Sequence, residues 1–334
     1  MTGHQTAALE VRNLTTTFAT GVGAVTPVDD VSFRVMPGEV MGLVGESGSG
    51  KSVTLRSILG LLPLNGVAQG EVIWRGRNLL TLPPRELRAV RGGQISMIFQ
   101  EPMTALNPVL PVNLQIDENL RAHTDLNGAG RKARARELMD LVGIPDAARR
   151  LGEYPHQFSG GMRQRVMIAI ALASNPQLLL ADEPTTALDV TIQDQILKLI
   201  LDLRDAMAMS VVLVTHDLGV VATTCDRMAV MYAGRIVETG PVTEVFASPQ
   251  HAYTRGLLGS VPRAGTERSP LTSIEGTPPG LSSLPIGCAF HPRCTFATDV
   301  CRIRPPVMEP SGPGRAVACF HRDLVVAAGS GLHG

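Results

Sequence analysis

The stretch Gly45-Glu46-Ser47-Gly48-Ser49-Gly50-Lys51-Ser52 decides the fold that this sequence predicts. It fits the phosphate-loop pattern, a glycine and four variable residues followed by Gly-Lys-Ser or Gly-Lys-Thr. An apolar, strand-like run precedes it over 39–44, and a helical pattern follows over 52–60. This strand–loop–helix context distinguishes a phosphate loop from an ordinary glycine-rich turn. The stretch therefore predicts a binding site for nucleotide phosphates.

The residue types of this loop suit the chemistry of phosphate binding. Glycine and serine let the backbone wrap closely and direct its N–H groups at phosphate oxygens. The helix that begins here adds the positive end of its dipole. In loops of this kind the lysine, here Lys51, reaches the outer phosphates, and the hydroxyl group of Ser52 binds Mg²⁺. Every residue from Gly45 to Ser52 is therefore a candidate nucleotide ligand.

Length and composition limit the class of protein. The 334 residues suffice for one large α/β domain and a smaller unit, and the 44% of apolar residues can form a substantial core. Lys+Arg and Asp+Glu are balanced at 30 each, which argues against a nucleic-acid binder driven by bulk charge. No apolar run is long enough to cross a bilayer, and the N-terminal residues lack a secretory signal pattern. We expect a cytoplasmic chain that contacts a membrane through partners.

Two further strand patterns end in residues that could act on a nucleotide. The apolar run 177–181 leads into Asp182 and Glu183. Asp182 would bind Mg²⁺ beside a phosphate loop, and Glu183 would polarise a water for attack on the γ-phosphate. The alternative is a strand that ends in solvent with two acidic residues. His216 follows the buried pattern 210–215 and is either a γ-phosphate contact or an ordinary hydrogen-bonded histidine.

Three weaker signals have simpler explanations when taken alone. Gln100 ends a predicted strand and would normally be a solvated strand end. Ser159 is a good helix N-cap, and Gly160 and Gly161 after it predict an exposed helix start that can bind an anion, although a capped turn has the same pattern. Phe18 lies in an alternating strand and could either stack on a base or join the core.

In their order and spacing, these motifs together resemble the nucleotide-binding subunit of an ABC transporter, over roughly residues 8–260. The stretches 45–52, 99–108, 161–169 and 248–258 are most similar to ATPase subunits of oligopeptide and dipeptide importers. The resemblance implies an α/β P-loop NTPase of the ABC cassette type, with a RecA-like core, an antiparallel β subdomain and a helical subdomain at about 103–175. A linker and a short cysteine-containing C-terminal extension, 261–334, would follow.

The resemblance also implies a role for each motif residue. Phe18 corresponds to the base-stacking aromatic residue, Glu183 to the catalytic base and His216 to the γ-phosphate switch. Lys51 and the loop amides form the phosphate clamp. The Mg²⁺ shell comprises Ser52, Gln100 and Asp182.

Two further segments of the family act between subunits. The signature, which contacts ATP bound to the opposite subunit, corresponds to Ser159, Gly160, Gly161 and Met162. Met162 stands where the family more often has glutamine, but the serine and both glycines are kept. The segment Ala187-Leu188-Asp189 is similar to the one that links the two ATP sites.

Four of the five cysteines lie near the C-terminus: Cys288, Cys294, Cys301 and Cys319. In a reducing compartment such a group predicts metal binding before it predicts disulfides. Some importers of this group are similar here and carry a [4Fe–4S] cluster on four such cysteines, the usual number for that cluster. Zn²⁺ also takes four thiolates, and His291 and His321 lie nearby. The sequence contains no Cys-x-x-Cys pair, which weakens finger-type zinc and ferredoxin-type interpretations alike.

The expected function is that of the ATP-hydrolysing subunit of a peptide importer, bound peripherally at the cytoplasmic face of the membrane. The resemblance implies a second ATPase subunit, two transmembrane permease subunits and an extracytoplasmic solute-binding protein, and no nucleic acid. One alternative is import of nickel or another small solute. Others are a soluble, non-transport ABC ATPase, which usually carries two cassettes or coiled-coil insertions, and a regulatory nucleotide sensor.

Overall fold

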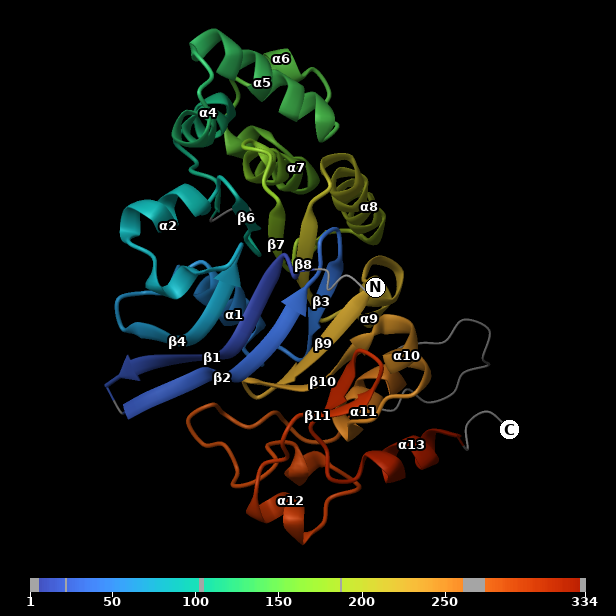
Figure 1. The fold of residues 1–334 in the computed structure, drawn as a ribbon. Coiled ribbons are helices and arrows are strands. Elements are labelled where there is room, and N and C mark those ends of the chain that lie inside the picture. The colour runs from blue at the N-terminus through green and yellow to red at the C-terminus, as the bar shows by residue number, and fades with distance from the viewer. Residues whose placement is uncertain (1–5, 22, 102–104, 187, 261–273, 331–334) are drawn as a thin grey trace, which may run out of the picture. The chain divides into compact units, whose positions relative to one another are not determined.

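The computed structural model describes residues 6–21, 23–101, 105–186, 188–260 and 274–330 (Figure 1). The chain divides into two compact units. The first unit comprises Met1–Ala8, Val35–Glu39 and Thr81–Val214, and the second comprises Leu9–Arg34, Val40–Leu80 and Thr215–Gly334. The first part of the predicted linker, 261–273, lies outside the described residues.

The second unit contains a four-stranded antiparallel sheet in the order β2-β1-β4-β5. Its strands are β1 (Leu9–Thr20), β2 (Gly23–Val35), β4 (Gly66–Trp74) and β5 (Arg77–Asn78). Side chains alternate along β2, where Val31 and Phe33 are buried while Ser32 and Arg34 are exposed. This period of two is typical of a sheet with one face on the core. The predicted antiparallel β subdomain is confirmed.

A second group of strands in this unit carries the phosphate loop. Its members are β3 (Val40–Val44), β9 (Arg227–Tyr232), β10 (Arg235–Pro241), β11 (Glu309–Gly312) and β12 (Arg315–Val317). Strand β3 is wholly buried and pairs in parallel with β9, and β9 and β10 form a hairpin. Ala233 and Gly234 turn this hairpin with φ of 47° and 87°, because a tight hairpin turn requires positive φ at both central residues.

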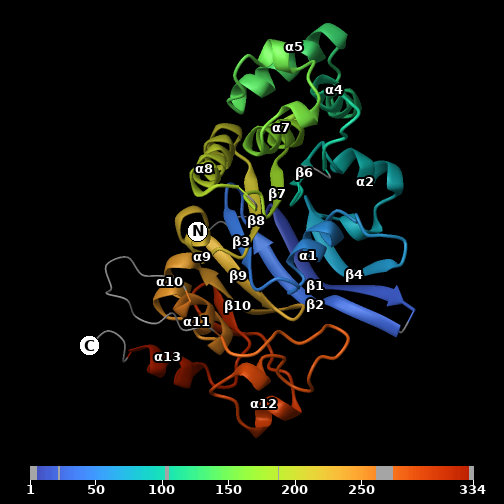
Figure 2. The same ribbon diagram turned by 180° about the vertical axis from the view of Figure 1, so that it is seen from behind.

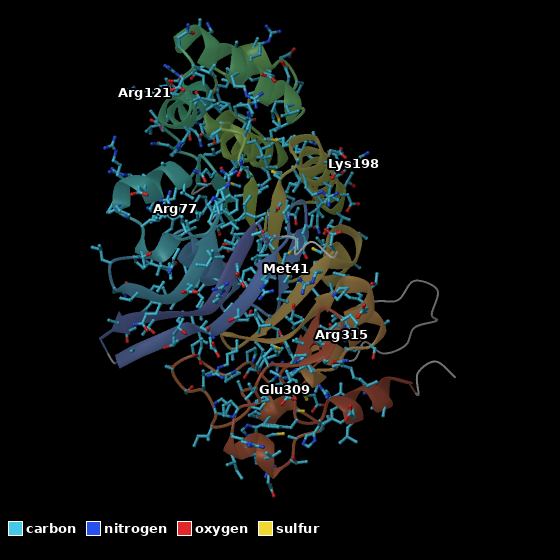
Figure 3. The ribbon with its side chains drawn as sticks, in the orientation of Figure 1. Met41, Arg77, Arg121, Lys198, Glu309 and Arg315 are labelled. Atoms are coloured by element: carbon cyan, nitrogen blue, oxygen red, sulfur yellow. The ribbon has the colours of Figure 1, made fainter. Side chains whose placement is uncertain are left out.

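The C-terminal extension continues this sheet, which the sequence did not indicate. Strand β12 pairs antiparallel with β10, and β11 pairs with β12. Arg315 of β12, labelled in Figure 3, donates to Glu238 Oε1 at 3.1 Å, and both side chains are buried. Glu238 also accepts from the backbone N–H groups of Gln250 and His251. A buried carboxylate held in this way fastens the extension to the cassette strands.

The helices of the second unit pack around these strands. They are α1 (Lys51–Ile58), α9 (Leu218–Thr224), α10 (Val242–Ala247), α11 (Ala252–Gly259), α12 (Asp299–Ile303) and α13 (Arg322–Ser330), with a 3₁₀ turn η3 (His291–Arg293). Figure 2 shows α1 beside β1, where the hydroxyl groups of Thr16 and Ser57 are 2.7 Å apart and buried. One hydrophobic core contains Val44 of β3 together with Phe290 of the extension.

The first unit contains three parallel strands covered by helices. The strands are β6 (Ile95–Ile98), β7 (Leu178–Asp182) and β8 (Ser210–Thr215). Strand β6 pairs with β7, with Ile98 opposite Ala181, and β7 pairs with β8, with Asp182 opposite Val214. All their residues are buried, as expected for parallel strands covered on both faces. Their carboxyl ends meet at one edge, so residues that follow β6 and β7 lie close together.

Helices form the rest of the first unit. They are α2 (Pro84–Val90), α4 (Val112–His123), α5 (Gly128–Leu141), α6 (Ala147–Arg150), α7 (Gly160–Leu172) and α8 (Val190–Met207), with a 3₁₀ turn η2 (Pro155–Gln157). A further 3₁₀ turn, η1 (Leu79–Thr81), spans the point in the sequence where the second unit ends and the first resumes. Helix α4 packs on α5 and α7, which gives the helical subdomain that the sequence predicted (Figure 1). Among the described residues, none of the helices combines the length and apolar character needed to cross a membrane.

Candidate functional site

The loop between β3 and α1 has a backbone that only glycine can adopt without strain. Gly45, Gly48 and Gly50 have φ of 152°, 78° and 104°. A Cβ atom at Gly45 would collide with the carbonyl oxygen of Met231, and one at Gly50 with that of Pro27. These close approaches explain why the loop has glycine at both positions. The backbone is thus folded tightly around the space in front of α1.

Lys51 stabilises this loop from within. Lys51 is only 4% exposed, and its Nζ donates to the carbonyl oxygens of Gly45 at 2.8 Å and Glu46 at 2.9 Å. Gly50 caps α1 in the left-handed conformation, and Thr54 Oγ1 donates to its carbonyl oxygen at 3.0 Å. The helix therefore begins at the loop, where its first N–H groups and its dipole favour an anion.

Phe18 lies on β1, in the same unit as the phosphate loop. Its ring covers Gly66 on the paired strand β4, since a Cβ atom at Gly66 would come within 2.5 Å of Phe18 Cε1. The side chain is half-buried and is not part of the buried core. An aromatic ring with one face on glycine and another accessible can stack on a planar ligand.

In the first unit, the ends of β6 and β7 bring Gln100 and Glu183 together. Gln100 Nε2 donates to Glu183 Oε2 at 3.1 Å, and Thr186 Oγ1 donates to the same oxygen at 2.8 Å. Asp182, the last residue of β7, is fully buried. Thr186 was not among the residues expected from the sequence, although its position three residues after Glu183 was a usable signal.

Glu183 also has an unusual backbone. Its φ is 45°, in the left-handed region that costs most side chains on the order of 1 kcal/mol or more. Its N–H group donates to the carbonyl oxygen of Val214 at 3.0 Å, which continues the strand ladder by one residue. Strain of this kind clusters at functional sites, because the surrounding structure must hold the residue in place.

The Ser159 segment forms an accessible helix start. Ser159 is the N-cap of α7, and its Oγ accepts from Met162 N at 3.4 Å. Ser159 and Gly160 are exposed, and Gly161 faces α8, where a Cβ atom would lie 2.8 Å from Ile192 Cγ2. The N-cap prediction is confirmed, and an exposed helix N-terminus is available to an anion.

The remaining predicted residues lie beside these elements. Ala187 is outside the described residues, while Asp189 directly precedes α8 and its backbone carbonyl oxygen accepts a hydrogen bond from Gln193 N at 2.8 Å. His216 follows β8 and is exposed. Phe18, the phosphate loop and His216 belong to the second unit, whereas Gln100, Asp182, Glu183 and the Ser159 segment belong to the first.

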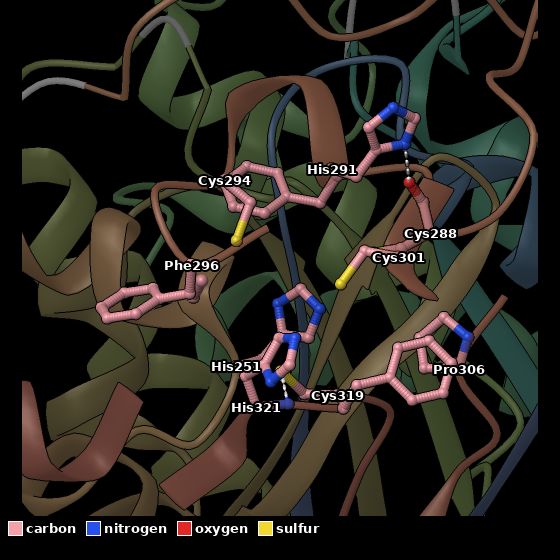
Figure 4. A pocket seen from close by; sticks show the side chains of 12 residues that line it. His251, Cys288, His291, Cys294, Phe296, Cys301, Pro306, Cys319 and His321 are labelled. Atoms are coloured by element: carbon pink, nitrogen blue, oxygen red, sulfur yellow. Dashed lines mark hydrogen bonds between the residues drawn. The ribbon is translucent and has the colours of Figure 1, made fainter. Parts of the chain in front are cut away.

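All four cysteines of the extension line one pocket in the second unit (Figure 4). Burial raises the pKa of the Cys288 thiol to about 11, and it also raises the pKa of Cys294 and Cys319. The pocket also includes His251, whose pKa burial lowers to about 4. Among the residues that the structure describes, no group of three or more His, Cys, Asp or Glu side chains is arranged to hold a metal ion.

The two pocket histidines that the sequence offered as metal ligands make hydrogen bonds within the extension. His291 Nδ1 lies 2.9 Å from the carbonyl oxygen of Cys288, and His321 Nε2 lies 2.7 Å from Thr298 Oγ1. The four thiols line one pocket, and the predicted [4Fe–4S] or Zn²⁺ site stays a hypothesis.

Comparison with known families matches two parts of the chain. Residues 28–186 match the model described as "ABC transporter", and residues 237–301 match "Oligopeptide/dipeptide transporter, C-terminal region". The second match spans the end of the cassette and three of the four pocket cysteines.

Similar proteins cover nearly the whole chain. A probable peptide ABC transporter ATP-binding protein of Sinorhizobium fredii is 53% identical over 95% of this chain and 96% of its own length. The oligopeptide transport ATP-binding protein of Salmonella typhimurium is 50% identical over 93% of each chain. Among solved structures, a dimeric ATP-binding cassette in a post-hydrolysis state with ADP and Pi is 31% identical, with a TM-score of 0.63 over 70% of this chain and 98% of that one.

Proposed function

Because this chain belongs to the ATP-binding subunits of ABC transporters of the oligopeptide/dipeptide type, and is therefore an ABC ATPase, we propose that it powers peptide import. The match of residues 237–301 to the C-terminal region of oligopeptide/dipeptide transporters carries this proposal. Relatives at 53% and 50% identity are named for peptide and oligopeptide transport, which favours peptides over nickel or other small solutes. Both relatives are named as transport proteins, which also argues against a soluble, non-transport ATPase.

The proposed chemistry gives every site residue a part in ATP binding or hydrolysis. Lys51 and the loop amides bind the phosphates of ATP, and Phe18 stacks on its base. Ser52, Gln100 and Asp182 fit the oxygen-ligand preference of Mg²⁺, the ion that neutralises developing phosphoryl charge. Glu183 accepts the proton of the attacking water, with Gln100 and Thr186 fixing its carboxylate, and His216 contacts the γ-phosphate.

We further propose that two such subunits work head to tail. The exposed start of α7 at Ser159, Gly160, Gly161 and Met162 would contact ATP held by the other subunit. A similar solved cassette is dimeric, which supports this arrangement. Residues 8–260 would form the cassette, with its helical subdomain at about 103–175, and 261–334 the linker and extension. Two permease subunits and an extracytoplasmic binding protein would complete the importer and hold this chain at the cytoplasmic face of the membrane.

Peptide-stimulated hydrolysis tests the transport class directly. The complex is purified with its membrane subunits, and ATP hydrolysis is measured with dipeptides, longer peptides or Ni²⁺ presented on the binding protein. Stimulation by peptides and not by Ni²⁺ is expected, because substrate-loaded binding protein drives closure of the two ATPase subunits. Stimulation by Ni²⁺ alone would reject peptides as the transported solute and assign nickel in their place. Basal hydrolysis without any response would reject both solutes and leave the ATPase assignment intact.

For the cysteine pocket we propose a [4Fe–4S] cluster, with Zn²⁺ as the alternative. Four thiols match the ligand type and number of such a cluster, and all four line one pocket whose walls include Phe290 and Phe296. Such a cluster would tie four points of the extension together. In the chain itself, Cys319 Sγ accepts from His321 N at 3.4 Å, the kind of hydrogen bond that tunes a ligand sulfur.

Anaerobic purification should therefore yield about four iron atoms and four sulfides per chain, with visible absorption. Cys301→Ser and Cys319→Ser should lose the iron and the absorption. Cys225→Ser is the matched control, because Cys225 packs on the core near Val221, outside the pocket, and should keep the full iron content. One zinc per chain in place of iron would establish the alternative. A purified chain that contains neither iron nor zinc would reject both proposals.

A further inference from the structure

The second residue of the phosphate loop, Glu46, is held by the C-terminal part of the chain. Its backbone N–H group donates to Tyr253 Oη of α11 at 2.8 Å. Its carboxylate accepts two hydrogen bonds from Arg293 of η3, with Nη1 2.8 Å from Oε2 and Nη2 3.0 Å from Oε1. A guanidinium that binds both oxygens of a carboxylate fixes its orientation as well as its position.

Arg293 is itself immobilised, so it can act as a fixed point. Its side chain is 5% exposed, against 28% for Glu46. Its Nε donates to the carbonyl oxygen of Glu275 at 3.0 Å, and its guanidinium lies over the rings of Tyr232 and Phe290, 5.9 and 5.8 Å from their centroids. A planar cation clamped between rings and carbonyls loses little further freedom when it binds a carboxylate.

Glu46 is also where the hydrogen bonds from Arg293 meet those from Lys51. Lys51 Nζ donates to the carbonyl oxygen of Glu46, while Arg293 holds the carboxylate of the same residue. The backbone of Glu46 is therefore fixed at its N–H group, its carbonyl group and its side chain. A shift of Glu46 would move the carbonyl oxygen that positions Lys51, and with it the loop amides that follow.

We propose that Arg293 is a positioning residue for ATP binding, which sets the start of the phosphate loop through Glu46. This inference rests on the phosphate-loop role proposed above. Arg293 directly precedes Cys294, and Phe290 beneath it lines the cysteine pocket and packs against Tyr232 and Tyr253 at 5.2 and 5.4 Å between ring centroids. The cysteine extension is thereby part of the support of the nucleotide site, and its integrity sets the affinity for ATP.

The test is the effect of Arg293→Ala on ATP hydrolysis and nucleotide binding by the whole complex. We expect the KM for ATP and the dissociation constant of a fluorescent ATP analogue to rise about tenfold, while kcat stays within about twofold. The loop amides contact ATP in the ground state and in the transition state alike, so loosening them weakens uniform binding. Arg293→Lys keeps the charge and loses the paired geometry, and it should recover part of the affinity.

A double-mutant cycle with Glu46→Gln separates positioning from a general loss of stability. If Arg293 acts through Glu46, Arg293→Ala should add little to the KM of Glu46→Gln. Arg302→Ala is the matched control, because Arg302 lies on the same segment with its side chain 65% exposed, and it should leave the KM unchanged. An equal effect of Arg293→Ala in both backgrounds, or a lower melting temperature with an unchanged KM, would overturn the proposal.

Lys51→Ala, measured in the same assays, separates a failure of the Arg293 proposal from a failure of the phosphate-loop proposal. If Lys51→Ala abolishes hydrolysis and Arg293→Ala changes nothing, the positioning role of Arg293 is rejected and the phosphate-loop proposal is kept. If Lys51→Ala is fully active, the phosphate-loop proposal fails first. Should Arg293→Ala not fold, Arg293→Lys and Glu46→Gln still decide the question, because both preserve most of the packing around Tyr232 and Phe290.

Discussion

Glu183→Gln is expected to bind ATP and to hydrolyse it at least about 100 times more slowly than the native chain. A positioned general base contributes roughly 10²- to 10⁴-fold to a reaction of this kind. Glutamine has the shape of glutamate but cannot accept the proton of the attacking water. The loss should therefore appear in kcat, with the KM for ATP little changed.

The surroundings of Glu183 make this substitution informative. The hydrogen bonds from Gln100 Nε2 and Thr186 Oγ1 both reach Oε2, and a glutamine carbonyl oxygen can accept the same two bonds. The left-handed backbone at this position is unaffected, since both residues have the same constraints there. A change in turnover then reports on the lost basicity and not on a rearranged strand end.

The measurement compares steady-state ATP hydrolysis with ATP retained on the purified complex. The matched control is Glu137→Gln on α5, whose side chain is 66% exposed and pairs with Arg134, and full activity is expected there. Retained ATP with almost no phosphate release supports Glu183 as the base. Normal turnover of Glu183→Gln would remove Glu183 from that role.

The sequence was sufficient for the parts of the site that depend on local geometry. The glycines of the phosphate loop are required by positive φ and by collisions with the carbonyl groups of Met231 and Pro27, so the pattern alone marked the loop. Uniformly apolar runs predicted the buried parallel strands, and the carboxyl ends of β6 and β7 then had to bring Gln100 near Glu183. Ser159 was predictable as a cap from its residue type and the glycines after it.

Long-range partners were beyond sequence reasoning. Glu46 and Arg293 are 247 residues apart, and nothing in the composition of either segment marks them as a pair. Strand β12 is three residues long and joins the sheet only because β10 offers an edge, so its short pattern carried no signal. The density of cysteines did suggest a shared site, but the spacing could not show that Phe290 connects it to Arg293.

Lys51→Ala is expected to abolish ATP hydrolysis, with a loss of at least about 100-fold. Removing one preorganised donor to a developing anionic charge typically costs 10²–10³ in kcat. Lys51 supplies a full positive charge, and its near-complete burial limits solvent screening of that charge. The substitution also removes the hydrogen bonds that Nζ makes to Gly45 and Glu46, which should loosen the start of the loop.

Nucleotide binding and single-turnover hydrolysis, measured together, show where Lys51 acts. Lost binding would assign its charge to the ground-state phosphates, whereas retained binding without turnover would assign it to the transition state. Lys198→Ala on α8 is the matched control, since Lys198 is exposed and its loss should change neither quantity (Lys198 in Figure 3). Full activity of Lys51→Ala would refute the phosphate-loop assignment, and with it the roles proposed here for Glu46 and Arg293, because both act only through that loop.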